Sequence, residues 1–134
     1  MNRRERWDTS DRIVAVIAVV TILAGAGQMI VPDIALGGLG LEADGASIFA
    51  FRLASFMILC FGALLLHEVL TGSIGKGTLW VGIQKLGAAL LLVTALLSGD
   101  AATPAWAIVV WDGLCGVFLS GRAFRSKRPL AGAE

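Results

Sequence analysis

The stretch IVAVIAVVTILAGAGQMIV, residues 13–31, decides the class of fold because it is apolar throughout and carries no charged side chain. A bilayer core about 30 Å thick needs about 20 helical residues at a rise of about 1.5 Å each. Further apolar stretches follow at residues 47–70, 79–98 and 104–121. Their lengths and spacing predict an all-α protein, a bundle of four transmembrane helices.

The composition also indicates an integral membrane protein. Hydrophobic residues make up 57% of the 134-residue chain and charged residues 16%, and the mean hydropathy is +0.82. Soluble domains average about 45–50% apolar and about 25% charged residues. We therefore predict one membrane domain at residues 13–121, between an N-terminal arm at residues 1–12 and a basic tail at residues 122–134. No charged run is long enough to indicate a nucleic-acid partner.

The distribution of basic residues predicts how the chain is oriented. Short cytoplasmic segments of membrane proteins are enriched in Lys and Arg. The arm, the segment around Lys76 and the tail hold the basic residues outside the spans, whereas residues 32–46 and 99–103 hold only acidic ones. Both termini are therefore expected in the cytoplasm. Residues 32–46 are expected to form a connecting loop or a short segment that folds over the mouth of the bundle.

The N-terminus allows a second interpretation. A basic arm, an apolar stretch and the small residues 24–26 resemble a secretory signal peptide with its cleavage site. The arm, however, also carries Glu5, Asp8 and Asp11, and the apolar run continues through residue 31. We therefore expect this segment to be retained as the first span.

The other three spans contain ionisable side chains at membrane depth: Arg52, Lys85 and Asp112. An isolated charge in hydrocarbon costs about 2.5–3.5 kcal/mol on insertion scales. The helical rise places Asp112 axially between the two cations. We expect all three to converge in one polar pocket inside the bundle, with Gln84 and Trp111 beside them.

Small residues indicate that Lys85 and Asp112 face neighbouring helices. Each charge is followed at positions i+3 and i+4 by small side chains, and such stripes mark helix–helix contacts in lipid. The stripes are Ala88 and Ala89 after Lys85, and Cys115 and Gly116 after Asp112.

Several interpretations of this polar cluster stay open. Two cations and one carboxylate leave a surplus of +1, which an anion or a head group with hydrogen-bond acceptors would complete, because unmatched charge is disfavoured in a low-dielectric site. A fatty acid, a phospholipid head group or a quinone carbonyl would serve. Alternatively, the network only fixes helix register, Arg52 reaches an interface, or Lys85 is neutral.

His67 and Glu68, at the cytoplasmic end of the second span, are secondary candidates. A single His excludes a bis-His haem within one subunit, and the simplest interpretation is an interfacial His beside a solvated helix end. Cys60 and Cys115 form no C-x-x-C pair, and no hydrolase, metalloprotease or phosphate-loop motif is present. We predict no catalytic residue set, no metal site and no cofactor other than a bound lipid or quinone.

Over residues 24–124 the chain resembles small bacterial four-helix membrane proteins, mostly uncharacterised and distantly DoxX-like. The residues that carry the resemblance are Pro32 and the Gly-Leu loop after it, Arg52, Gln84-Lys85 with Gly87, and Pro104 with Trp111-Asp112 and Phe118. The resemblance implies a multi-pass protein of the bacterial cytoplasmic (inner) membrane. It also implies an accessory component of a redox or lipid-handling system.

The leading functional hypothesis is a non-catalytic accessory or ligand-binding component for a lipid- or quinone-like molecule. Its expected partners are membrane lipids and either further copies of itself or a larger membrane complex. One alternative is a small oligomeric proton-coupled transporter, although the first span lacks the acidic residue on which small multidrug exporters of this size depend. Another is a membrane enzyme acting on an apolar substrate, with Asp112 or Glu68 as general acid or base.

Overall fold

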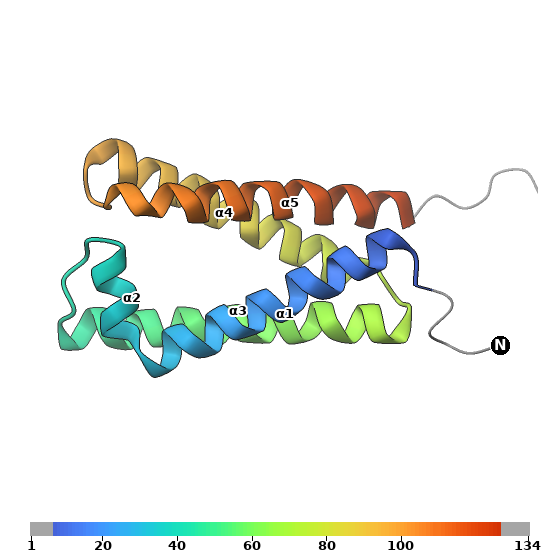
Figure 1. The fold of residues 1–134 in the computed structure, drawn as a ribbon, viewed down its shortest axis with the longest axis horizontal. Coiled ribbons are helices and arrows are strands. Elements are labelled where there is room, and N and C mark those ends of the chain that lie inside the picture. Colours follow the sequence, from blue (N-terminus) through green and yellow to red (C-terminus); the bar gives the residue numbers. More distant parts are fainter. Residues whose placement is uncertain (1–6, 127–134) are drawn as a thin grey trace, which may run out of the picture.

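The computed structural model describes residues 7–126 as a bundle of helices (Figure 1). Its elements are α1 (Thr9–Ile30), α2 (Pro32–Gly38), α3 (Gly45–Thr71), α4 (Lys76–Ser98), the short 3₁₀ helix η2 (Thr103–Ala105) and α5 (Trp106–Ser126). No strand occurs within that range. The four long helices are each long and apolar enough to cross a membrane. The prediction of an all-α protein with four candidate spans is therefore confirmed.

Polar caps and glycines set the ends of the long helices. Asp44 begins α3 with a capping box, in which its carboxylate accepts from the Ser47 N–H at 2.6 Å and its own N–H donates to the Ser47 hydroxyl at 2.9 Å. The Ser47 N–H, with the Ser47 hydroxyl, lowers the pKa of Asp44. The helices α3 and α4 end where Gly72 and Gly99 adopt positive φ angles of 69° and 83°, a backbone conformation that only glycine adopts without a Cβ penalty.

The long helices pack as two antiparallel pairs. The first pair, α1 with α3, is called here the N-terminal hairpin, and the second, α4 with α5, the C-terminal hairpin. Contacts within each hairpin are far more extensive than contacts between the hairpins. Figure 1 shows the two pairs lying together at one end of the molecule and spreading apart toward the other.

Glycines permit the close approach of helices within the N-terminal hairpin. A Cβ added at Gly25 would lie 2.7 Å from the Leu59 backbone nitrogen, and one at Gly62 would lie 2.8 Å from the Ile22 nitrogen. Both distances are shorter than van der Waals contact, so any larger side chain would push the two helices apart. Such small-residue crossings are a main source of helix association in lipid.

Glycines also permit the close approach of α4 and α5 within the C-terminal hairpin. A Cβ added at Gly116 would lie 2.7 Å from Leu86 Cγ, and one at Gly82 would lie 3.0 Å from the Ser120 backbone nitrogen. Each hairpin is therefore closed by one glycine from each of its two helices, independently of the other hairpin.

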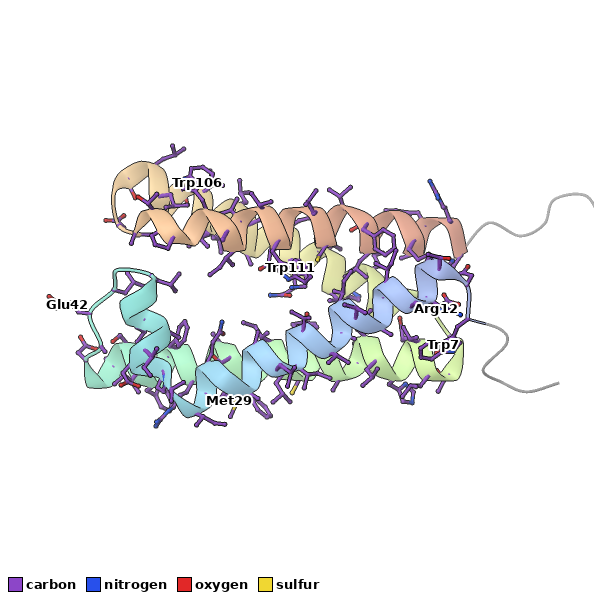
Figure 2. The ribbon with its side chains drawn as sticks, in the orientation of Figure 1. Trp7, Arg12, Met29, Glu42, Trp106 and Trp111 are labelled. Carbon is purple, nitrogen blue, oxygen red and sulfur yellow. The ribbon has the colours of Figure 1, made fainter. Side chains whose placement is uncertain are left out.

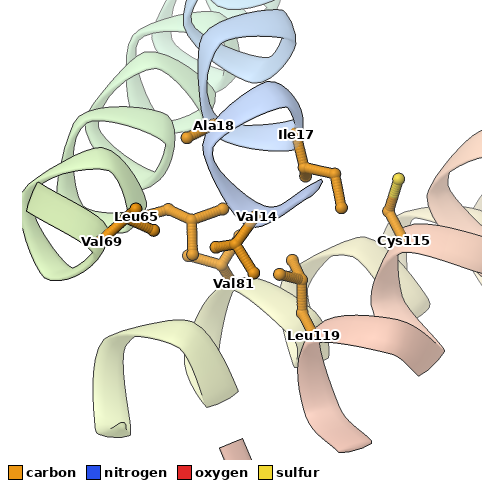
Figure 3. Close-up of a cluster of buried hydrophobic side chains, with 8 residues drawn as sticks. All are labelled: Val14, Ile17, Ala18, Leu65, Val69, Val81, Cys115 and Leu119. Carbon is orange, nitrogen blue, oxygen red and sulfur yellow. The ribbon is translucent and has the colours of Figure 1, made fainter. Parts of the chain in front are cut away.

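The buried apolar core joins all four long helices, but only in one half of the bundle (Figure 3). Its members are Val14, Ile17, Ala18, Leu65, Val69, Val81, Cys115 and Leu119. This half also contains the two ends of the described chain and the α3–α4 connection (Figure 1). An ion pair between Arg122 and Asp11, with 2.9 Å between Nη2 and Oδ1, links the end of α5 to the start of α1.

The two ends of the bundle differ in the sign of their charges. The end with the chain termini, called here the basic end, carries Arg12, Lys76, Arg122 and Arg125. The opposite end, called the acidic end, carries Asp33, Glu42, Asp44 and Asp100. The remaining basic residues of the arm and the tail lie outside the described residues.

At the acidic end the two connecting segments touch each other. Residues 32–46 contain the helix α2 rather than a plain loop. The segment after α2 meets the residues before η2, where the Ala102 N–H donates to the Leu39 carbonyl at 2.8 Å. This contact joins the hairpins beyond the region where their helices spread apart.

Candidate functional site

Lys85 and Asp112 form a buried ion pair near the middle of the bundle. Lys85 Nζ lies 2.6 Å from Asp112 Oδ1, and the side chains are only 6% and 13% exposed. The small residues Ala89 and Cys115 beside them are buried as well, as expected of a helix–helix face. Lys85 comes from α4 and Asp112 from α5, so the pair lies within the C-terminal hairpin.

The structure does not bring Arg52 to this pair, and the expected convergence of three charged groups is wrong for this residue. Arg52 is exposed and takes part in none of the ion pairs found among residues 7–126. On α3, Ile58 faces the space between the hairpins, and Arg52 precedes it by six positions. At about 100° per residue, the two side chains leave α3 about 120° apart. Arg52 thus has a suitable depth but the wrong direction.

The loss of Arg52 changes the charge balance of the site. One ammonium faces one carboxylate, so the expected surplus of +1 does not exist. An anionic ligand is therefore not needed to balance the charge of this site.

A cavity of about 490 Å³ lies against the ion pair, between the two hairpins. This volume falls within the range of about 300–1,000 Å³ typical of small-molecule sites. Its polar lining consists of Thr21 and Gln28 from α1, Gln84 and Lys85 from α4, and Asp112 from α5, with Trp111 beside them. Four of the five residues expected in the polar cluster, Gln84, Lys85, Trp111 and Asp112, therefore line one cavity.

Two polar atoms in the walls of this cavity have no hydrogen-bond partner within the described part of the chain. They are Thr21 Oγ1, on a residue only 2% exposed, and Gln84 Oε1. Thr21 belongs to the N-terminal hairpin and Gln84 to the C-terminal hairpin, so the two residues line the cavity from different hairpins. An unsatisfied buried polar group costs about 1–3 kcal/mol. Both atoms are covered by neighbouring atoms, and each has hydrogen-bonding capacity that the described residues do not use.

The ion pair adds further hydrogen-bonding capacity. An ammonium group has three N–H donors, and Lys85 directs one of them to Asp112. Together with the Thr21 hydroxyl, which can both donate and accept, and the Gln84 side-chain oxygen, the residues that line the cavity include both donors and acceptors. A small neutral head group that carries both an acceptor and a donor would satisfy these atoms.

Trp111 lies midway along the bundle, between the two hairpins (Figure 2). Its ring lines the polar cavity and also a second hollow of about 410 Å³ between α1 and α5. The second hollow extends toward the basic end, where Thr9 and Arg12 line it, and is otherwise bordered by apolar side chains, among them Val16 and Leu114.

Reasoning from the sequence missed the contribution of α1. Thr21 and Gln28 stand at positions i and i+7 of an otherwise apolar span, a spacing that puts both on one helix face. Gln28 also accepts a hydrogen bond from the Ser55 hydroxyl, at 3.3 Å. That shared face was the available signal for a polar wall on the first span.

The secondary candidates do not join the cavity. His67 is exposed near the basic end. Glu68, expected to be a solvated helix end, is instead half-buried, and its carboxylate accepts from the N–H groups of Gly75, Gly77 and Thr78 at 3.3, 2.8 and 2.7 Å. The Thr78 hydroxyl also donates to it at 2.6 Å. Glu68 therefore caps the start of α4, whose first amides have no partner within their own helix.

Metal-ligand chemistry receives no support from the described residues, among which no group of three or more His, Cys, Asp or Glu side chains could hold an ion. Cys60 and Cys115 are free thiols, the first exposed and the second buried.

Comparison of the chain with protein-family models, with curated proteins and with solved structures finds no match. The distant resemblance to DoxX-like proteins stays a prediction.

Proposed function

We propose that the protein is a non-catalytic component of the bacterial inner membrane that binds a neutral, lipid-soluble ligand with a quinone- or quinol-like head. The head occupies the cavity between the two hairpins. One observation carries the proposal: Thr21 and Gln84, which line one cavity from different hairpins, each have a buried polar atom with no partner among the described residues.

The orientation forms part of the proposal. The basic end carries Arg12, Lys76, Arg122 and Arg125, whereas the acidic end carries only acidic charges. By the positive-inside rule, the basic end with both termini belongs in the cytoplasm.

Charge balance supports a neutral ligand. Lys85 and Asp112 neutralise each other, so an anion entering the cavity would remain uncompensated and its desolvation would be costly. Of the ligands considered from the sequence, this disfavours an ionised fatty acid or a phospholipid head group and leaves a quinone-like molecule.

The depth of the site supports the same ligand class. Asp112 lies about 9 Å along α5 from Trp106, and Lys85 about 14 Å along α4 from Lys76, at about 1.5 Å per residue. In a hydrocarbon core about 30 Å thick, the pair is far from both interfaces. Charged lipid head groups stay at the interface, whereas a small neutral head can move to this depth.

The hydrogen-bonding groups fit such a head. A carbonyl oxygen would accept from the Lys85 ammonium or the Thr21 hydroxyl, and a phenolic hydroxyl would donate to Gln84 Oε1. The ligand would therefore bridge the two hairpins.

Retention of small molecules during purification tests this proposal. The wild-type protein and the variants Thr21→Val and Gln84→Leu are isolated in mild detergent, and the compounds extracted from each are quantified by mass spectrometry. Loss of one hydrogen bond is worth about 0.5–1.5 kcal/mol, so each variant is expected to retain up to about tenfold less of a neutral lipid-soluble compound.

Thr94→Val is the matched control, because Thr94 is exposed on α4 and its hydroxyl donates to the Leu91 carbonyl. This variant is expected to retain the compound at the wild-type level. A wild-type protein that carries no such compound, or equal retention by Thr21→Val, would contradict the proposal.

A further inference from the structure

We infer that the ligand carries a hydrocarbon chain, and that this chain leaves the cavity past Trp111 and lies in the apolar hollow between α1 and α5. This inference rests on the proposed function. It specifies the ligand as a head group with a long chain and assigns a separate chain subsite to the protein.

The two spaces share a lining residue, Trp111, and this adjacency carries the inference. The side chain of Trp111 lines both the polar cavity and the apolar hollow. The hollow is bordered along α1 by Ile13 and Val16 and along α5 by Leu114 and Phe118. A molecule whose head contacts Lys85 and whose chain contacts Leu114 would therefore pass directly over the Trp111 ring.

The polar residues give the chain its direction. Thr21 and Gln28 lie in the wall of the cavity on α1, and Gln28 lies near the acidic end of that helix. Beyond them, the Leu39 carbonyl and the Ala102 N–H join the connecting segments. A hydrocarbon chain running that way would desolvate polar groups without replacing their hydrogen bonds, whereas the hollow toward the basic end is lined by apolar residues except for Thr9 and Arg12.

The seam between α1 and α5 also gives the ligand access from the bilayer. Contacts between α1 and α5 are sparse compared with those within either hairpin. At the seam, Val16 is 58% and Leu114 69% exposed, so the hollow is open to lipid. Trp111, at the junction of head and chain, is assigned here as the residue that positions the ligand.

Two quinones that differ only in having a chain provide the test. The probes are tetramethylbenzoquinone, which has no chain, and trimethyl-decyl-benzoquinone, in which a decyl chain replaces one methyl group. Each is titrated into nanodiscs containing the full-length protein, and binding is followed as the saturable quenching of tryptophan fluorescence that Trp111→Phe removes.

Val16→Phe narrows the chain subsite without adding a tryptophan. Val19→Phe is the matched control, because Val19 is also an exposed valine of α1 but borders neither space. Val16→Phe is expected to weaken binding of the decyl quinone about fivefold or more, as overpacking of a filled site does. It should leave binding of tetramethylbenzoquinone unchanged, and Val19→Phe should affect neither probe.

The outcomes separate this inference from the proposed function. If Val16→Phe weakens neither probe, or both equally, while tetramethylbenzoquinone still binds in a Gln84-dependent way, the chain subsite is wrong and the proposed function stands. If neither quinone causes saturable quenching in the wild-type protein, the proposed function fails and the chain subsite fails with it.

Discussion

The ammonium of Lys85 lies 2.6 Å from the carboxylate of Asp112, and both residues belong to the C-terminal hairpin. The pair therefore fixes α4 to α5 and does not hold the two hairpins together. The cavity is also lined by Thr21 and Gln28 of the N-terminal hairpin. The cavity therefore lies between two hairpins, each of which is held together by its own helix–helix contacts.

Removal of one member of the ion pair should be strongly destabilising. Asp112→Asn or Lys85→Met leaves its partner as an uncompensated buried charge, which typically costs about 3–5 kcal/mol. Thermal unfolding followed by circular dichroism at a fixed detergent concentration should show a large fall in Tm for each single variant.

The double variant Lys85→Met with Asp112→Leu is the control for that prediction. Replacing both charges by apolar groups is often neutral for stability, so its Tm should recover toward the wild-type value. Retention of the bound compound should nevertheless be lost. A double variant as unstable as either single variant would show that the pair contributes more than mutual neutralisation.

The glycine crossing of the N-terminal hairpin predicts a position-specific effect. Gly25→Ala places a methyl group 2.7 Å from the Leu59 nitrogen, and such overpacking costs about 1–3 kcal/mol. Gly27 lies on the same helix with nothing within 4 Å of an added Cβ. Gly27→Ala should therefore be neutral or stabilising by about 0.5–1 kcal/mol, because Ala favours a helix over Gly. Equal unfolding temperatures for the two variants would argue against the close crossing.

The cap that Glu68 supplies to α4 predicts a second local effect. Glu68→Ala removes the acceptor from three backbone N–H groups of residues 75–78. Gly77 and Thr78 are buried, so their N–H groups would be left without a partner, and the expected loss is about 1–3 kcal/mol. His67→Ala, at an exposed neighbouring position, should leave the Tm unchanged. Hydrogen exchange at the start of α4 should rise in Glu68→Ala alone.

Replacement of the Thr21 hydroxyl should weaken ligand binding without lowering the stability of the protein. In ligand-free protein Thr21→Val removes a buried polar atom that has no partner, so the Tm should stay equal or rise by an amount corresponding to about 1 kcal/mol. The same variant should bind the quinone probes less tightly. A marked fall in the Tm of the ligand-free variant would indicate that the hydroxyl stabilises the protein itself.

The capping box of α3 predicts a pH dependence with a definite sign. Because the Ser47 N–H lowers the pKa of Asp44, the ionised cap stabilises the fold above the unfolded-state value of about 3.9. This contribution is lost as the pH falls through the lower pKa of the folded state. Asp44→Asn keeps a capping oxygen without a titrating charge. The Tm of wild type relative to that of Asp44→Asn should therefore fall as the pH is lowered below the unfolded-state value and through the lower pKa of the folded state, and parallel curves would count against it.

Hydropathy and periodicity were enough to predict the four long helices and the inward direction of Lys85 and Asp112. Those features depend on the length of each apolar stretch and on the small residues beside each charge. Both are local properties of the sequence.

The position of Arg52 could not be obtained in the same way. The rise of the helix gives the depth of a residue, but its direction around the helix axis depends on which neighbours pack against which face. The packing of α3 on α1 through Gly25 and Gly62 fixes that direction, and it turns Arg52 away from the pair. The prediction that Glu68 is solvated was wrong for a related reason, because its hydrogen-bond partners lie at the start of the following helix, α4.

The closure of each hairpin by its own glycines also bears on how the chain enters the membrane during synthesis. The N-terminal hairpin can complete its helix crossing before α4 and α5 have been translated. Lys85 and Asp112 are then delivered together on the second hairpin, so the two charges can meet the hydrocarbon as a neutral pair. The biogenesis of this bundle can therefore proceed in two self-contained insertion steps.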